Sequence, residues 1–118
     1  MQSEEKYMRA ALAEARKAEK KSEVPVGAVI VAPDGSIVAR AHNERTTKCD
    51  PTAHAEILAL RKAGKKLGHW NLEGYELYVT KEPCVMCAGA IVLSRIARVR
   101  YGAFDRRFGC AGTVKSLT

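Results

Sequence analysis

The strongest constraint on the fold of this chain is a set of three zinc-ligand side chains with one additional carboxylate. His54 and Glu56 stand two residues apart, and Cys84 and Cys87 follow in a Pro-Cys-x-x-Cys segment. A structural zinc site is normally closed by four protein ligands, whereas a catalytic site has three and leaves the fourth position to water. We therefore predict one catalytic Zn²⁺ per chain, held by His54, Cys84 and Cys87, and a fold that brings these two segments together.

The sequence around the ligands predicts how they are oriented. Apolar residues recur at helical spacing over 55–63, so a helix is expected to begin near His54. Thr52 or Asp50 is the expected N-cap of this helix. Pro83 predicts the first position of a second helix, which carries both cysteines. Two helix N-termini should then meet at the metal, where their positive dipole ends favour the thiolate forms that zinc needs.

These side chains are suited to hydrolytic deamination. Zinc held by two thiolates and one imidazole lowers the pKa of a coordinated water toward about 7. Glu56 is the predicted catalytic residue, because a carboxylate beside the metal can accept a proton, pass it to a ring nitrogen and later protonate a leaving amine. A His-x-Glu segment followed by Pro-Cys-x-x-Cys is typical of zinc-dependent nucleobase deaminases.

A Cys-x-x-Cys pair taken alone has other interpretations. It is also typical of a redox pair, of one half of a structural zinc site, or of two buried cysteines. Cys49, Cys110, His42 and His69 could supply a fourth ligand to a structural site, but none of them belongs to a second paired motif. A noncatalytic nucleic-acid-binding module with a structural zinc is therefore one alternative to an enzyme.

The composition indicates one domain, residues 1–118. A chain of 118 residues with 47% hydrophobic and 28% charged residues can bury a modest core but is too short for two ordinary domains. Its four cysteines suggest no disulfide framework, and its sequence shows no signal peptide or apolar run long enough to span a membrane. We therefore expect a cytoplasmic protein without membrane contact.

The charge of the chain favours a polyanionic partner. The net charge is +7 and the isoelectric point is near 9.4. The segment 104–108 interleaves aromatic side chains, which can stack on bases, with arginines, which can hold phosphates. Phe104, Arg106 and Arg107 are therefore predicted nucleic-acid contacts. The alternative interpretation of this segment is an ordinary solvated loop after a strand.

The order of predicted elements indicates an α/β fold. Helices are expected over Ser3–Lys21, over the segment that begins near His54, and from Cys84 to about Leu93; strands are expected over Val26–Ala32, Ser36–Ala41, Glu76–Thr80 and Ala97–Tyr101. The first two strands form a hairpin around a Pro-Asp-Gly turn. We expect a three-layer α/β/α fold whose mixed sheet opens with this antiparallel hairpin and continues with parallel strands. The site should lie at the strand ends where the helices begin.

Four segments carry a resemblance to a known family. They are Val-Pro-Val-Gly-Ala-Val at 24–29, Asp-Pro-Thr-Ala-His-Ala-Glu at 50–56, Glu-Pro-Cys-Val-Met-Cys-Ala-Gly-Ala at 82–90, and Ser-Arg-Ile at 94–96. The chain resembles the bacterial tRNA-specific adenosine deaminases of the cytidine deaminase-like superfamily over nearly its whole length. The resemblance implies a cytidine deaminase-like fold, a homodimer, and conversion of adenosine to inosine at the wobble position of a tRNA anticodon. The implied partner is a tRNA anticodon stem-loop or another single-stranded nucleic acid.

The same resemblance implies roles for individual substrate-binding residues. Asn43 would hydrogen-bond the target base, and Val24 and Pro25 would help to wall the pocket. Ala55 belongs to the same substrate-binding set. Asp105 stands where the family contacts the RNA backbone near the target. The alternative interpretation of Asn43, without the resemblance, is a turn residue after the second strand.

Two features depart from the family pattern. Lys81 stands where the family usually has leucine, and its charge must reach solvent or substrate to avoid a desolvation cost. The sequence ends at Thr118, where the family continues, so we expect the last strand and helix to be missing and the strand at 97–101 to form an exposed edge. Alternatives to tRNA editing are a deaminase of free guanine or cytosine, and a shortened or engineered form that acts on single-stranded DNA.

Overall fold

The computed structural model describes residues 2–102, which form three helices and four strands. The elements are α1 (Gln2–Lys20), β1 (Gly27–Val31), β2 (Ile37–His42), α2 (Ala55–Leu67), β3 (Glu76–Val79), α3 (Val85–Ser94) and β4 (Arg98–Tyr101). All predicted helices and strands are present, and α2 continues beyond the predicted periodic stretch to Leu67. Within the part described, none of the helices is long and apolar enough to cross a membrane.

The four strands form one mixed sheet in the order β2-β1-β3-β4. β1 is antiparallel to β2, which confirms the opening hairpin, and β3 is parallel to β4. β3 pairs antiparallel with β1, however, so the expected parallel pairing begins only between β3 and β4. The reason is the crossover through α2, which carries the chain past β1 and gives β3 the same direction as β2. Among the four described strands, β1 is therefore the one that runs opposite to the others.

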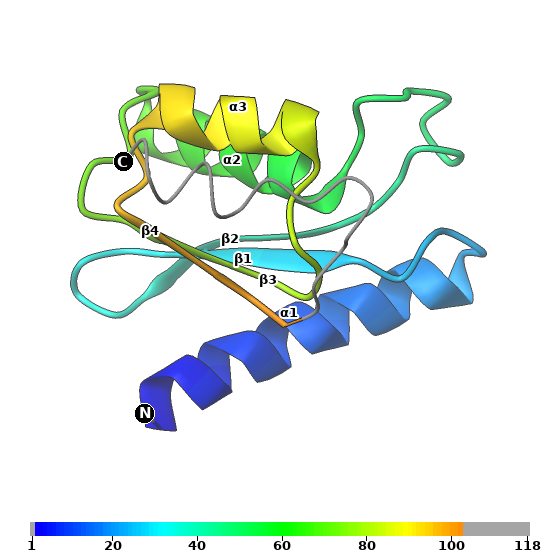
Figure 1. Cartoon of the computed structure of the whole chain (residues 1–118), viewed down its shortest axis with the longest axis horizontal. Helices are drawn as coiled ribbons and strands as arrows, with labels where there is room; N and C mark the ends of the chain where they lie inside the picture. Colours follow the sequence, from blue (N-terminus) through cyan, green and yellow to red (C-terminus); the bar gives the residue numbers. More distant parts are fainter. Residues whose placement is uncertain (1, 103–118) are drawn as a thin grey trace.

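The sheet lies between two helical layers, as Figure 1 shows, with α1 on one face and α2 and α3 on the other. β1 is buried on both faces because it is central. Ala28 and Ile30 pack into the larger core under α2 and α3, whereas Val29 and Val31 pack with Tyr7 in a smaller cluster against α1. The predicted three-layer α/β/α arrangement is thus confirmed.

Gly27 allows α1 to lie directly on the start of β1. A Cβ atom at this position would lie 2.0 Å from the Ala11 carbonyl oxygen and 2.5 Å from the Ala15 nitrogen, so no other residue fits without moving the helix. This contact fixes where the segment 21–26 leaves α1 and enters the sheet. That segment is one wall of the site described below.

Candidate active site

His54 is the N-cap of α2 and has an extended backbone, with φ −77° and ψ 153°. Because His54 precedes the helical geometry, its side chain and that of Glu56 can face the same space although they are two residues apart. The prediction that Thr52 or Asp50 caps this helix was wrong. The Asp50 carboxylate instead accepts hydrogen bonds from the Thr52 nitrogen at 2.9 Å and the Thr52 hydroxyl at 2.7 Å, and so shapes the turn before the helix.

Cys84 is the N-cap of α3, with φ −74° and ψ 177°, and Cys87 lies in the first turn. Pro83 therefore precedes the N-cap, and the prediction that it is the first helical residue was wrong. The fixed φ of proline suits an extended segment as well as a first turn, so the residue type alone did not distinguish the two. The prediction that two helix starts meet is confirmed, since the ligand atoms of His54 and both cysteines lie within 4.8 Å of one another.

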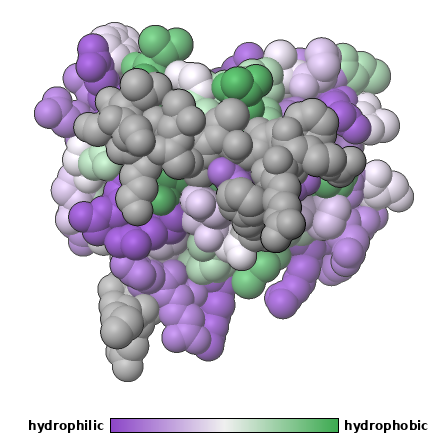
Figure 2. Space-filling model, in the orientation of Figure 1, coloured by the Kyte–Doolittle hydropathy of each residue, from purple (hydrophilic) through white to green (hydrophobic). Residues whose placement is uncertain are grey.

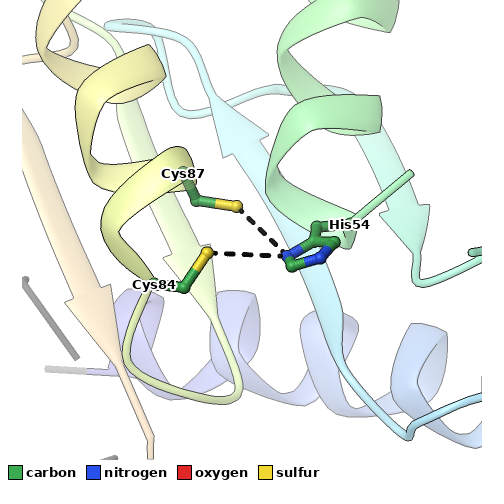
Figure 3. Close-up of side chains that lie close together, drawn as sticks. All are labelled: His54, Cys84 and Cys87. Atoms are coloured by element: carbon green, nitrogen blue, oxygen red, sulfur yellow. Dashed lines mark hydrogen bonds between the residues drawn. The ribbon is translucent and has the colours of Figure 1, made fainter. Parts of the chain in front are cut away.

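The side chains of His54, Cys84 and Cys87 point toward one another (Figure 3), and both nitrogen–sulfur distances fit a tetrahedral zinc site. The Nδ1 atom of His54 lies 3.7 Å from Sγ of Cys84 and 3.6 Å from Sγ of Cys87. Zinc bonds of about 2.1 Å to nitrogen and about 2.3 Å to sulfur separate such ligands by about 3.6 Å at a tetrahedral angle. Two sulfurs and one imidazole are also ligands that zinc prefers over the hard cations Mg²⁺ and Ca²⁺. His54, Cys84 and Cys87 are thus a zinc-binding group.

The electrostatics of these groups also fit a cation. Burial, with a smaller contribution from Arg45, lowers the pKa of His54 and favours the neutral imidazole that a metal requires. Cys87 is fully buried, and burial together with the nearby Glu56 carboxyl raises the pKa of its thiol. Several acidic groups are therefore crowded at one buried point. A divalent cation there compensates the cost of ionising them and draws the thiols into their thiolate forms.

Glu56 lies in the first turn of α2 and is 4% exposed, and it stands outside the ligand group. Burial raises the pKa of its carboxyl, while a hydrogen bond with Cys87 and the charge of Lys81 act in the opposite direction. Such a carboxyl next to a metal site can accept a proton and return it, which is what general acid–base catalysis requires.

A cavity of about 360 Å³ opens beside the zinc ligands, within the size range of small-molecule sites. It is lined by Val24, Val26, Asn43, Arg45, His54, Ala55, Glu56, Lys81, Glu82 and Cys84. Of the predicted substrate-binding residues, the structure places Val24, Asn43 and Ala55 on its wall; Pro25 is not among the lining residues; and Phe104, Asp105, Arg106 and Arg107 lie outside the described residues.

Three lining residues were not predicted: Val26, Arg45 and Glu82. Val26 follows Val24 at the spacing of two that puts side chains on one side of an extended chain, so alternation could have indicated it. Glu82 begins the segment 82–90 that carries the resemblance, but it was not assigned to the pocket. Arg45 carried no signal in the sequence, because the direction of its loop depends on the fold. Lys81 is half-buried on the cavity wall, at the position where its charge was expected to meet solvent or substrate.

Asn43 is 7% exposed and its amide has a defined orientation. One terminal atom of the side-chain amide accepts a hydrogen bond from the Arg45 backbone nitrogen at 3.1 Å and is therefore the oxygen. The other terminal atom is the amide nitrogen. That nitrogen lies 3.5 Å from the Val24 carbonyl oxygen, a long contact that leaves donor capacity for a ligand. Asn43 is thus both the turn residue and the cavity-lining residue that the sequence suggested as alternatives.

A second hollow, about 810 Å³ in volume, lies between α2 and α3. We call it the α2–α3 groove; its walls include Ile57, Leu60, Trp70 and Leu93, and both Trp70 and Leu93 are largely exposed. Figure 2 shows hydrophobic side chains reaching the surface along the upper edge, over α3, while hydrophilic side chains cover α1 at the lower edge. An exposed apolar surface of this kind is typical of a protein interface.

An α/β/α fold with a three-ligand zinc group, a buried carboxylate outside it and an adjoining cavity defines a zinc-dependent hydrolase of the nucleobase-deaminase class. Residues 1–103 match the family described as the cytidine and deoxycytidylate deaminase zinc-binding region, and the chain belongs to this family. This result supports zinc as the cofactor independently of the geometry.

The chain is also similar to individual deaminases. A tRNA-specific adenosine deaminase of Bacillus subtilis is 56% identical over 117 residues, which cover 99% of this chain and 72% of that protein. A solved structure from a study of A-to-I editing by tRNA:A34 deaminases at the wobble position superimposes with a TM-score of 0.85 at 50% identity, covering 87% of this chain and 78% of the other. A guanine deaminase from Bacillus subtilis superimposes with a TM-score of 0.81 at 44% identity, covering 85% and 64%.

Proposed function

We propose that this chain is a tRNA adenosine deaminase, a zinc-dependent hydrolase that converts adenosine to inosine at the wobble position of a tRNA anticodon. The observation that carries the proposal is the cavity in which Glu56, outside the metal ligands, faces the same space as His54 and Cys84. The adenosine deaminase of Bacillus subtilis supports the choice of substrate, because its identity extends over nearly the whole chain.

The chemistry requires a water, a proton carrier and an oriented base. When bound by His54, Cys84 and Cys87, zinc supplies a water that ionises near neutral pH. Glu56 would take a proton from this water and deliver it to a ring nitrogen of the adenine as the oxygen adds to the carbon that bears the amino group. Glu56 would then take the proton of the newly formed hydroxyl and pass it to the amino group, which leaves as ammonia while the hydroxyl becomes the carbonyl of inosine. Asn43 orients the base through the amide hydrogen that its long contact with Val24 leaves available.

The net charge of +7 supports a nucleic-acid substrate rather than a free base. Arg45 and Lys81 both line the cavity and place positive charge beside the base-binding site. A flipped nucleotide carries a phosphate on either side, and cations at this position can hold them. The partner that fits is a tRNA anticodon stem-loop or another single-stranded nucleic acid.

The direct test is to incubate the zinc-loaded protein with an anticodon stem-loop that carries a wobble adenosine, with single-stranded DNA of the same sequence, and with free guanine and cytosine. We expect inosine in the RNA and a loss of that product in Glu56→Gln. Product from DNA as well would show that the chain accepts both RNA and single-stranded DNA. Conversion of free bases alone would favour the activity named for the Bacillus subtilis guanine deaminase.

The same experiment separates an enzyme from a noncatalytic module. A structural zinc protein would bind the stem-loop equally well with glutamate or glutamine at position 56 and would form no product. We expect Glu56→Gln to retain zinc, because Glu56 is outside the ligand group, and to lose turnover.

We also propose that the chain forms a homodimer through the α2–α3 groove. The groove exposes Trp70 and Leu93, at 65% and 75%, and a second copy would bury both. Interfaces are enriched in such aromatic and aliphatic anchors. Sedimentation of wild type and Leu93→Asp, each as zinc-loaded protein, tests this assembly.

We further propose a domain organisation and a cellular location for this chain. Residues 1–118 form a single deaminase domain, which the continuous core beneath α2 and α3 supports for the described part. The protein acts in the cytoplasm, where tRNA is processed and where a reducing environment preserves thiolate ligands. Fractionation of cells, with zinc content measured in the soluble fraction, tests the second expectation.

A further inference from the structure

Glu23 is a buried carboxylate that holds a loop distant in sequence. It follows the C-terminus of α1, where its backbone nitrogen donates to the Ala18 carbonyl at 2.9 Å, and it is 6% exposed. Its carboxylate accepts three hydrogen bonds: from the Thr46 nitrogen at 3.1 Å, from the Thr47 nitrogen at 2.6 Å and from the Thr47 hydroxyl at 2.6 Å. One side chain thus fixes two successive residues of the loop that leads from β2 to His54.

These bonds belong to a larger contact between residues 23–26 and residues 43–47, which we call the seam. The Asn43 nitrogen donates to the Val26 carbonyl at 3.0 Å, and the Asn43 amide approaches the Val24 carbonyl. Both segments also line the cavity, through Val24 and Val26 on one side and Asn43 and Arg45 on the other. The seam therefore forms one wall of the cavity. Glu23 does not line the cavity, but its hydrogen bonds hold the two segments of this wall together.

The Glu23 carboxylate is ionised at ordinary pH. Hydrogen bonds, the largest from the Thr47 hydroxyl, lower the pKa of Glu23 to about 2. The carboxylate is an acceptor at both oxygens, and the loop presents only donors to it, so the match depends on ionisation. Arg45 stands between Asn43 and the residues held by Glu23, so these contacts fix the backbone from which its exposed side chain lines the cavity.

We propose that Glu23 is a positioning residue for the nucleic-acid substrate: it acts through Thr46 and Thr47 to hold Arg45 and Asn43 at the cavity wall. The inference rests on the proposed function for the identity of the substrate. It predicts a role in binding and none in the bond-breaking step, because Glu23 lines neither the cavity nor the metal site.

The first test compares Glu23→Gln with wild type in inosine formation on the anticodon stem-loop. A glutamine amide must turn its nitrogen toward Thr46 or Thr47, which sets a donor against a donor. We expect KM to rise about tenfold, with kcat changed less than about threefold and zinc unchanged. Asp34→Asn is the matched control, since Asp34 accepts two hydrogen bonds from Ser36 in the hairpin turn and lies outside the cavity.

A graded pair of variants protects this test against misfolding. Thr47 is exposed, so Thr47→Val removes only its hydroxyl donor and Thr47→Ser retains it. We expect Thr47→Val to raise KM about threefold and Thr47→Ser to restore the wild-type value. Equal KM values in wild type, Glu23→Gln and Thr47→Val, or a fall in kcat without a rise in KM, would overturn a positioning role.

The loop also provides a readout that needs no substrate. The amide hydrogens of Thr46 and Thr47 donate to Glu23, so their exchange rates in the zinc-loaded protein measure whether this contact holds. We expect both rates to rise about tenfold in Glu23→Gln and to stay unchanged in Asp34→Asn. If wild type forms no inosine, the proposed function fails. If wild type forms inosine while Glu23→Gln matches it in KM and in amide exchange, the positioning role fails.

Discussion

The cavity beside the zinc ligands and the α2–α3 groove differ in size, polarity and composition. The cavity measures about 360 Å³ and brings His54, Glu56 and Asn43 to one space. The groove measures about 810 Å³, and among the described residues its titratable groups form no metal-binding cluster. The larger of these two hollows is therefore the one that is not lined by the zinc ligands or by Glu56. Convergence of ligands and a proton carrier locates the reaction, whereas an exposed apolar surface locates a partner.

This contrast makes separate predictions for the two hollows. A substitution in the cavity should abolish turnover and leave assembly intact, and a substitution in the groove should do the reverse.

Glu56→Gln should produce the largest change. The glutamine keeps the shape of the side chain but can neither accept nor return a proton, so inosine formation should fall by about 10²- to 10⁴-fold. Zinc content and the sedimentation coefficient should match wild type, because Glu56 is neither a ligand nor part of the groove. Turnover above one tenth of the wild-type rate would assign the proton transfer to another group.

Cys87→Ala should remove the metal. Cys87 is a ligand and is fully buried, so its loss opens the site and weakens the core around α3. We expect zinc bound per chain to fall toward zero and the melting temperature to drop by at least about 4 °C, the shift produced by roughly 1 kcal/mol in a domain of this size. Chelation of wild type should give the same loss of activity. Retention of one zinc per chain would contradict the assigned ligand set.

Leu93→Asp should affect the groove alone. Leu93 is 75% exposed in the single chain, so the change costs the folded chain little but places a charge at the proposed interface. We expect the dissociation constant of the dimer to rise at least about tenfold while zinc content is retained, as measured by analytical ultracentrifugation. Gly89→Asp, on the same helix but outside the groove, is the control.

The smallest expected effect concerns the cavity wall in acid. Glu23 has a pKa lowered to about 2 from an ordinary value of 4.5, so its contribution to stability is complete above about pH 4.5 and is lost as the pH falls toward 2. The difference in unfolding free energy between wild type and Glu23→Gln should therefore be constant near neutrality and narrow over that range. Denaturant titrations at several pH values measure it, and a difference that widens in acid would be inconsistent with the assigned contacts.

Much of the fold and the metal site could be predicted because their signals are local. Hydrophobic periodicity indicated α1, and β-branched runs bounded by turn residues indicated β1 and β2. The zinc ligands were recognisable because metal chemistry restricts residue type and spacing. The antiparallel pairing of β3 with β1 was not predicted, since it depends on which edge of the hairpin receives the chain after α2.

Helix caps and cavity walls were harder to predict. Asp50 and Thr52 are good N-cap residues by type, yet they bond to each other and leave His54 as the cap. Arg45 lies in a loop that Glu23 holds from another part of the chain, through Thr46 and Thr47. These contacts leave no pattern in the sequence, because they join residues 23 and 24 positions apart.

The sequence by itself determined the reactive inventory: a histidine, two cysteines and a carboxylate at spacings that suit zinc and proton transfer, on helices whose starts could be located. Only the tertiary structure decided that His54 adopts an extended backbone, that the wall of the cavity is a seam between 23–26 and 43–47, and that the larger hollow lies elsewhere. The physical reason is the distance along the sequence over which each effect acts. Ligand chemistry and helix periodicity act within a few residues, whereas a cavity exists only where distant segments pack together.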